Sequence, residues 1–275
     1  MKYDLVIAYR ICPKMSKKSP DYVGTDKLSF SKKCLESFKK SLEGLNYKIY
    51  ALLDNCPKDY EDLFVDLFKP ESFEILHLED YGNKKTFKKQ IDILSSQNDA
   101  EIVYFAEDDY FYVESIKTMV DILKSKKADF VTPYEHVSCY IDDHVIPNRV
   151  TLFEGKRFVS VQHACLTFMT TKQNLIENKR YFSIYVDWFG SDFVVWGCIT
   201  LGSSFFKYSK LILDLKNFSL INLKVYGSMV LYALHRFFLN KKYVLVMPII
   251  SFGTHVEKDF MASGFDCKGI FQDSK

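Results

Sequence analysis

The stretch Glu101-Ile-Val-Tyr-Phe-Ala-Glu-Asp-Asp-Tyr110 is the clearest indication of architecture in this chain. Its five mostly apolar residues, 102–106, end abruptly at three carboxylates, Glu107, Asp108 and Asp109. A short apolar run with such a boundary indicates a buried strand of a parallel sheet. Because open α/β sheets bind ligands at the carboxyl ends of their strands, the three acids mark a candidate binding edge.

The first half of the chain alternates strand and helix patterns around this run. Strands are expected at 5–9, 47–53, 73–78, 102–106 and 128–132, and helices at 30–42, 57–68, 84–94 and 113–126. Gly44 lies where a helix-ending glycine is expected. This alternation predicts an α/β fold with a mostly parallel central sheet, right-handed crossovers and flanking helices.

Beyond Pro133 the pattern changes. Two strand-like runs, 150–153 and 157–161, flank Glu154-Gly155-Lys156 and predict a hairpin. The remaining expectations are a strand at 163–169, a short helix capped by Thr171, helices at 192–201 and 224–240, and a strand at 243–250 that leads into a loop at 251–255. Because no linker is visible, we expect one domain over 1–275, with a nucleotide-sugar-binding half at 1–133 and an acceptor-binding half at 134–275.

The composition favours a globular protein with a sizeable core, since 48% of the 275 residues are hydrophobic. The net charge of +2 gives general nucleic-acid binding no electrostatic support. Aromatic residues make up 16%, which fits either sugar-stacking faces or the composition of an A/T-rich genome. Seven cysteines without a CxxC pair favour a reducing compartment over a disulfide framework or a zinc site.

The sequence has no signal-peptide pattern at its start and no apolar run long enough to span a membrane, so we expect a cytoplasmic protein. The basic, aromatic-rich pattern at 224–240 could touch the anionic inner face of a membrane as a peripheral contact. An amphipathic helix packed on the domain is the more ordinary interpretation.

The three adjacent acids would repel one another unless a cation neutralised them. A hard divalent cation that bridges to a diphosphate satisfies this requirement. Glu107-x-Asp109 has the spacing of a DxD-type metal motif, in which one carboxylate binds the cation and its neighbour accepts a hydrogen bond from a ribose or sugar hydroxyl. A solvated surface triplet is the alternative.

Two further segments are expected at the same edge. Asp54 closes the strand at 47–53, where it could contact a base or ribose, and it or Asn55 could equally cap the helix near Pro57. Gly82 and Asn83 mark a tight turn that opens a helix, so that backbone N–H groups beside lysines could hold an anion. An ordinary turn with a solvated lysine face is the competing interpretation.

The second half supplies candidates for acid–base chemistry and metal binding. Asp192, at the mouth of a helix in an aromatic-rich segment, could act as a general base on a sugar hydroxyl, with Asp187 as the second candidate. Ser191 or Asp192 could instead be a helix N-cap. His255 could give the cation a nitrogen ligand, although a lone histidine is as often structural.

Together these residues resemble the GT-A class of nucleotide-sugar glycosyltransferases, and most of all the bacterial family 2 enzymes. The resemblance rests on the strand at 6–9, Asp54, the Gly82-Asn83 loop, the acid triplet, Asp192 followed by Trp196, and His255. Three positions depart from the family pattern. The triplet starts with Glu, Asp-Asn-Cys replaces Asp-Gly-Ser after the second strand, and Lys89-Gln90 stands near the usual Arg-Asn pair.

The resemblance implies an inverting, metal-dependent transfer of a sugar from a nucleotide-diphosphate sugar, with a UDP-sugar favoured. The acceptor would be a hydroxyl of a carbohydrate or lipid-linked glycan, in bacterial surface polysaccharide or glycoconjugate synthesis. It implies Mn²⁺ or Mg²⁺ held by Asp109, with His255 and Glu107 as further ligands, and Asp192 as base. The implied donor-binding residues are Ala8, Tyr9, Arg10, Asp54, Gly82, Asn83, Gln90, Glu107 and Asp108.

Three other functions remain open. A retaining glycosyltransferase would use the same metal motif without a base. A sugar-nucleotide pyrophosphorylase is disfavoured, because the region 10–29 lacks a glycine-rich signature loop. A non-catalytic carbohydrate-binding or assembly protein would carry the acids only as surface. The sequence gives no indication of the oligomeric state.

Overall fold

The apolar runs of the first half form parallel strands, as their pattern predicts. A computed structural model of the chain describes residues 1–136, 149–189, 192–200, 243–262, 264–265 and 267–272. The strands are β1 (Leu5–Ile11), β2 (Tyr47–Asp54), β3 (Phe73–Leu78), β4 (Ile102–Glu107), β5 (Tyr110–Tyr112), β6 (Phe130–Val131), β7 (Val150–Phe153), β8 (Lys156–Val161), β9 (Phe168–Thr171), β10 (Leu245–Pro248) and β11 (Gly253–His255).

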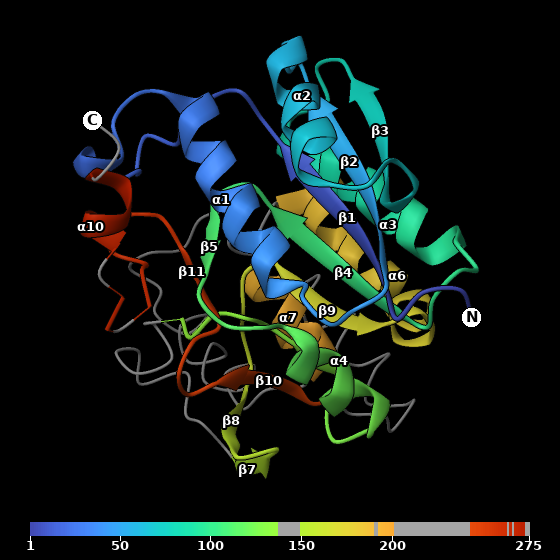
Figure 1. The fold of residues 1–275 in the computed structure, drawn as a ribbon. Helices are drawn as coiled ribbons and strands as arrows, with labels where there is room; N and C mark the ends of the chain where they lie inside the picture. Colours follow the sequence, from blue (N-terminus) through green and yellow to red (C-terminus); the bar gives the residue numbers. More distant parts are fainter. Residues whose placement is uncertain (137–148, 190–191, 201–242, 263, 266, 273–275) are drawn as a thin grey trace, which may run out of the picture.

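The helices follow the strands in alternation through the first half (Figure 1). They are α1 (Lys27–Ser41), α2 (Lys58–Leu67), α3 (Gly82–Ser96), α4 (Lys117–Lys124), α6 (Lys172–Ile184), α7 (Asp192–Thr200) and α10 (Cys267–Gln272). Short 3₁₀ turns span Asp21–Val23 and Pro70–Ser72, and a π-helical turn spans Tyr185–Phe189.

Nine of the described strands form one sheet in the order β3-β2-β1-β4-β9-β6-β10-β8-β7. The pairs β3–β2, β2–β1 and β1–β4 are parallel. Beyond β4 the sheet is mixed, because β9 lies antiparallel between β4 and β6. The predicted α/β class, with a large central sheet flanked by helices, is confirmed. The carboxyl ends of β1, β2 and β4 meet at one edge, which is where Arg10, Asp54 and the acid triplet lie.

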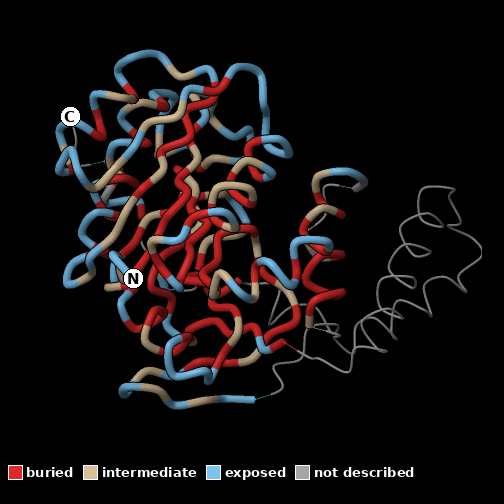
Figure 2. The backbone as a smooth tube through the Cα atoms, turned by 90° about the vertical axis from the view of Figure 1, so that its right-hand side faces the viewer, coloured by how far each residue is buried: buried red, intermediate tan, exposed pale blue. Residues whose placement is uncertain are grey.

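Helices cover both faces of the sheet, and two hydrophobic clusters lie between the layers. Side chains of α1, α2 and α4 pack on one face, where the Tyr9 ring contacts those of Phe38 and Phe64. Side chains of α3, α6 and α7 pack on the other, where Phe105 stacks on Phe168. The buried strands therefore run through the centre of the molecule, with exposed segments around them (Figure 2).

The region after the acid triplet differs from the prediction. The helix expected at 113–126 is confined to 117–124, and Tyr110–Tyr112 form β5, which pairs antiparallel with β11. The expected loop at 251–255 therefore contains a strand. Its partner lies far away in sequence, so local periodicity could not indicate the pairing. Val256 N–H also donates to the Asp109 carbonyl at 2.9 Å, which draws the two segments together.

Several local predictions are confirmed. The hairpin β7–β8 turns at Glu154 and Gly155, both with positive φ, and Gly44 has the positive φ of a helix-ending glycine. The Thr171 hydroxyl accepts the Asn174 N–H at 3.0 Å and caps α6. One bound differs from the prediction: the strand expected at 163–169 lies at Phe168–Thr171.

The pattern at 224–240 lies outside the described residues. None of the helices in the described part of the chain combines the length and the apolarity that crossing a membrane requires.

Candidate active site

A cavity of about 270 Å³ lies at the carboxyl edge of the parallel strands. Its walls come from the ends of β1, β2 and β4, the starts of α1 and α3, and the loop after β1. The residues that line it are Arg10, Ile11, Cys12, Lys14, Met15, Ser16, Ser19, Lys27, Phe30, Asp54, Gly82, Asn83, Thr86, Glu107, Asp108 and Asp109. The structure thus brings the acid triplet, Asp54 and the Gly82-Asn83 turn to one place, as the sequence predicts.

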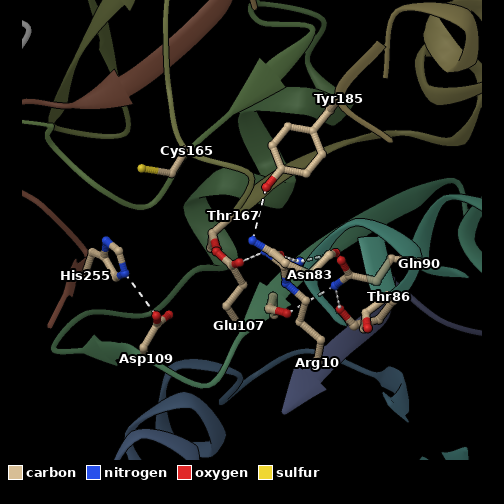
Figure 3. A network of polar contacts seen from close by, with 12 residues as sticks. Arg10, Asn83, Thr86, Gln90, Glu107, Asp109, Cys165, Thr167, Tyr185 and His255 are labelled. Carbon is tan, nitrogen blue, oxygen red and sulfur yellow. Dashed lines mark hydrogen bonds and ion pairs between the residues drawn. The ribbon is translucent and has the colours of Figure 1, made fainter. Parts of the chain in front are cut away.

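Asp109 is paired with His255. Asp109 Oδ2 lies 3.0 Å from His255 Nε2, and the pairing of β5 with β11 brings their segments side by side (Figure 3). The Tyr110 ring stacks on the imidazole with the centroids 5.0 Å apart. Burial disfavours charge on both groups, but their mutual attraction prevails and lowers the pKa of Asp109 while raising that of His255. The pair is held in a defined orientation.

Asp108 is paired with a lysine that the sequence did not single out. Lys27, in the first turn of α1, places its Nζ 2.7 Å from Asp108 Oδ2, and the Ser31 hydroxyl donates to the same oxygen at 3.1 Å. Burial opposes the charge on Lys27, but the negative charges of Asp108 and Asp109 outweigh it and raise its pKa. Asp26 caps this helix through the N–H groups of residues 28 and 29.

Glu107 is bound by two side chains. Arg10, at the end of β1, forms an ion pair with it, and the Thr167 hydroxyl donates to Glu107 Oε2 at 2.7 Å (Figure 3). Arg10 also donates to the backbone carbonyl of Asn83 at 3.2 Å and to its side-chain oxygen. The Asn83 amide in turn donates to the Tyr185 hydroxyl at 3.1 Å. One network therefore joins the ends of β1 and β4 to the start of α3.

Each acid of the triplet thus has its own cation within the protein. Arg10, Lys27 and His255 relieve the repulsion among the three carboxylates, so their proximity alone does not require a metal ion. Among the described residues, no group of three His, Cys, Asp or Glu side chains could hold a metal. Both carboxylate oxygens of Glu107 are engaged within the protein, one by Arg10 and the other by Thr167.

Asp54 has a role that neither sequence interpretation anticipated. Its oxygens accept the N–H of Tyr81 at 3.0 Å and of Gly82 at 2.7 Å, so it caps α3. The helix α2 begins after Pro57 without a side-chain cap, so the predicted capping of that helix is wrong. The anion position expected at the Gly82 turn is filled by the Asp54 carboxylate itself.

Three implied donor contacts lie in the core and not on the cavity wall. Ala8 and Tyr9 are fully buried in β1. Gln90 is also buried, and its amide donates to the carbonyls of Ala8 at 2.7 Å and Ala106 at 3.2 Å. These residues hold β1, β4 and α3 together, and none of them lines the cavity.

Asp192 lies in the first turn of α7 and is not among the residues that line the cavity. Its negative charge acts on Cys165 and on Tyr185. Burial raises the pKa of Cys165, and Asp192 and Asp109 both add to that shift. Burial also raises the pKa of Tyr185, which Arg10 opposes and Asp192 reinforces. Asp192 therefore lies within electrostatic range of the network at the cavity, whereas Asp187 is exposed on the π-helical turn.

The cavity wall has a charge balance that constrains its occupant. Among its described residues, Arg10, Lys14 and Lys27 oppose Asp54 and the acid triplet, which leaves one excess negative charge. The buried Oδ1 atom of Asp109 has no hydrogen-bond partner in the described part of the chain. A buried carboxylate oxygen without a partner is costly, and this atom can accept a hydrogen bond or contact a cation.

Sequence reasoning missed Lys27, Thr167 and Tyr185, because nothing in the local pattern around them marks a site.

No protein-family model and no curated protein matches the sequence. Among solved structures, the fold is similar to a galactosyltransferase, LgtC, solved in complex with donor and acceptor sugar analogues. The identity is 6% and the TM-score is 0.41, over 64% of this chain and 63% of that chain.

Proposed function

We propose that this chain is a glycosyltransferase that transfers a sugar from a nucleotide-diphosphate sugar, as the resemblance of its motifs implies. The observation that carries the proposal is the Asp109–His255 pair beside the cavity, with the buried Oδ1 of Asp109 left without a partner among the described residues. A carboxylate and an imidazole fixed at the carboxyl edge of a parallel sheet suit the binding of a ligand through a cation.

The geometry of the pair fits a divalent cation. Asp109 and His255 would hold the cation through a carboxylate oxygen and an imidazole nitrogen. These two atoms lie 3.0 Å apart, close enough for one ion to contact both. The excess negative charge of the wall supports the same proposal, because a diphosphate would add further negative charge.

Mn²⁺ or Mg²⁺ held by Asp109 and His255 would neutralise the diphosphate as it leaves. His255 would bind as the neutral imidazole and release to solvent the proton that it shares with Asp109. Arg10 and Thr167 keep Glu107 out of this ligand set and in place at the cavity wall.

We assign Asp192 as the base that deprotonates the acceptor hydroxyl, which would give inversion at the anomeric carbon. Its position at the start of α7, in electrostatic range of Cys165 and Tyr185, supports an acceptor that approaches from that side of the sheet. Following the resemblance, the acceptor is a carbohydrate or lipid-linked glycan.

The test is a screen of nucleotide-sugars for thermal stabilisation, with and without Mn²⁺, followed by product analysis with the donor that stabilises most. Ligands that bind the native state alone raise the melting temperature by mass action. We expect stabilisation by one nucleotide-sugar only with the metal present, and an inverted product. Asp192→Asn should lose transfer while it keeps donor binding. Full turnover in Asp192→Asn, or a product with retained configuration, would remove Asp192 from this role.

A further inference from the structure

Lys27 has an environment that pairing with Asp108 alone does not explain. Its Nζ contacts Asp108 Oδ2 at 2.7 Å and lies 4.8 Å from the centroid of the Phe30 ring. The residue is only 8% exposed, yet it lines the cavity. An ammonium carries three N–H donors, so one carboxylate contact leaves donors for an occupant of the cavity.

The position of Lys27 relative to the acids is equally specific. Lys27, Asp108 and Asp109 line the same cavity, and the charge of the ammonium acts on both carboxylates. Asp109 is also the residue that pairs with His255. A ligand in the cavity that reaches Asp109 would therefore pass within the electrostatic range of Lys27.

We propose that Lys27 binds the diphosphate of the ligand directly, with its ammonium shared between Asp108 and a phosphate oxygen. This rests on the proposed function and adds a recognition residue to it. Phosphate oxygens accept charge-assisted hydrogen bonds from lysine ammonium groups. Asp108 then holds the lysine in place and does not contact the cation.

The chain offers a matched set of variants. Lys27→Met removes the ammonium and keeps most of the side-chain volume, and Lys32→Met removes an exposed lysine from the same helix. Because Lys27→Met leaves Asp108 without its cation in a buried position, the double variant Lys27→Met/Asp108→Asn is needed. The double variant has the same net charge as the wild type and no uncompensated carboxylate.

The probes are inorganic pyrophosphate and UDP, titrated calorimetrically in the presence of Mg²⁺. Loss of one charge-assisted hydrogen bond predicts about 10- to 100-fold weaker binding of both probes in Lys27→Met. Lys32→Met should bind as the wild type does. The double variant should remain weak, because a direct contact is missing although the net charge is restored.

The outcomes separate this inference from the proposed function. Recovery of wild-type pyrophosphate affinity in the double variant would show that Lys27 acts only as the counter-ion of Asp108. Unchanged affinity in Lys27→Met would overturn the inference while the proposed function stands. A wild-type chain that binds neither probe would contradict the proposed function itself, and the role of Lys27 with it.

Discussion

Replacing Asp54 with alanine is expected to destabilise the fold, because its carboxylate caps α3. Asp54 is 7% exposed and accepts two N–H groups, from Tyr81 and Gly82. A single N-cap contributes about 1 kcal/mol, and a negative charge at a helix N-terminus adds about 0.3–1 kcal/mol. Two such bonds and the charge together predict that Asp54→Ala lowers the free energy of unfolding by about 2–3 kcal/mol. This decrease is smaller than the cost of losing two buried hydrogen bonds to a charged group. Tyr81 and Gly82 are exposed, so water can replace the carboxylate as the acceptor.

The assay is urea unfolding followed by circular dichroism, with Asp59→Ala as the control. Asp59 is an exposed acid in the first turn of α2, where only a weak interaction with the helix dipole is lost, so its removal should change the unfolding free energy by less than about 1 kcal/mol. The unfolding free energy of Asp54→Asn should lie between those of the wild type and Asp54→Ala. Its amide oxygen can accept one N–H, but its NH₂ group faces the second donor. An Asp54→Ala variant as stable as Asp59→Ala would refute the capping role.

Three further predictions concern two supports of the site and one cap elsewhere in the fold. Arg10→Met should cost about 3–5 kcal/mol in urea unfolding, because it leaves Glu107 largely buried without its cation, and adding Glu107→Gln should recover most of the loss. Gly253→Ala should weaken Mn²⁺ binding measured by calorimetry, since its Cβ would meet the Phe111 carbonyl oxygen at 3.0 Å and disturb the β5–β11 pairing that places His255. Thr171→Ala should lower stability by about 1 kcal/mol through loss of the α6 cap, without changing ligand affinity.

Features set by local sequence were predictable. The strand at 73–78 has the predicted bounds, and the hairpin at Glu154-Gly155 and the cap at Thr171 follow from residue types that adopt those conformations. The position of the acid triplet at a strand end was also predictable, because a continuous apolar run must be buried and carboxylates end it where the chain leaves the core.

Features set by contacts between distant segments could not be predicted from the sequence. The insertion of β9 between β4 and β6 depends on antiparallel pairing, which leaves no trace in the periodicity of either strand. The cations that neutralise the triplet come from β1, α1 and β11, and the residue that caps α3 comes from the end of β2. As a helix cap, Asp54 was considered only for the helix that follows it in the sequence, and it caps α3 instead.

The proposed site depends on one property, a cation held by Asp109 and His255 through which a nucleoside diphosphate binds. Calorimetric titration of UDP into the wild type and Asp109→Asn, each with Mn²⁺ and with EDTA, measures that property. We expect wild-type binding to require Mn²⁺, and Asp109→Asn to lose this dependence together with most of its affinity. UDP binding of equal strength in Mn²⁺ and in EDTA, or an Asp109→Asn variant that retains metal-dependent binding, would contradict the assignment.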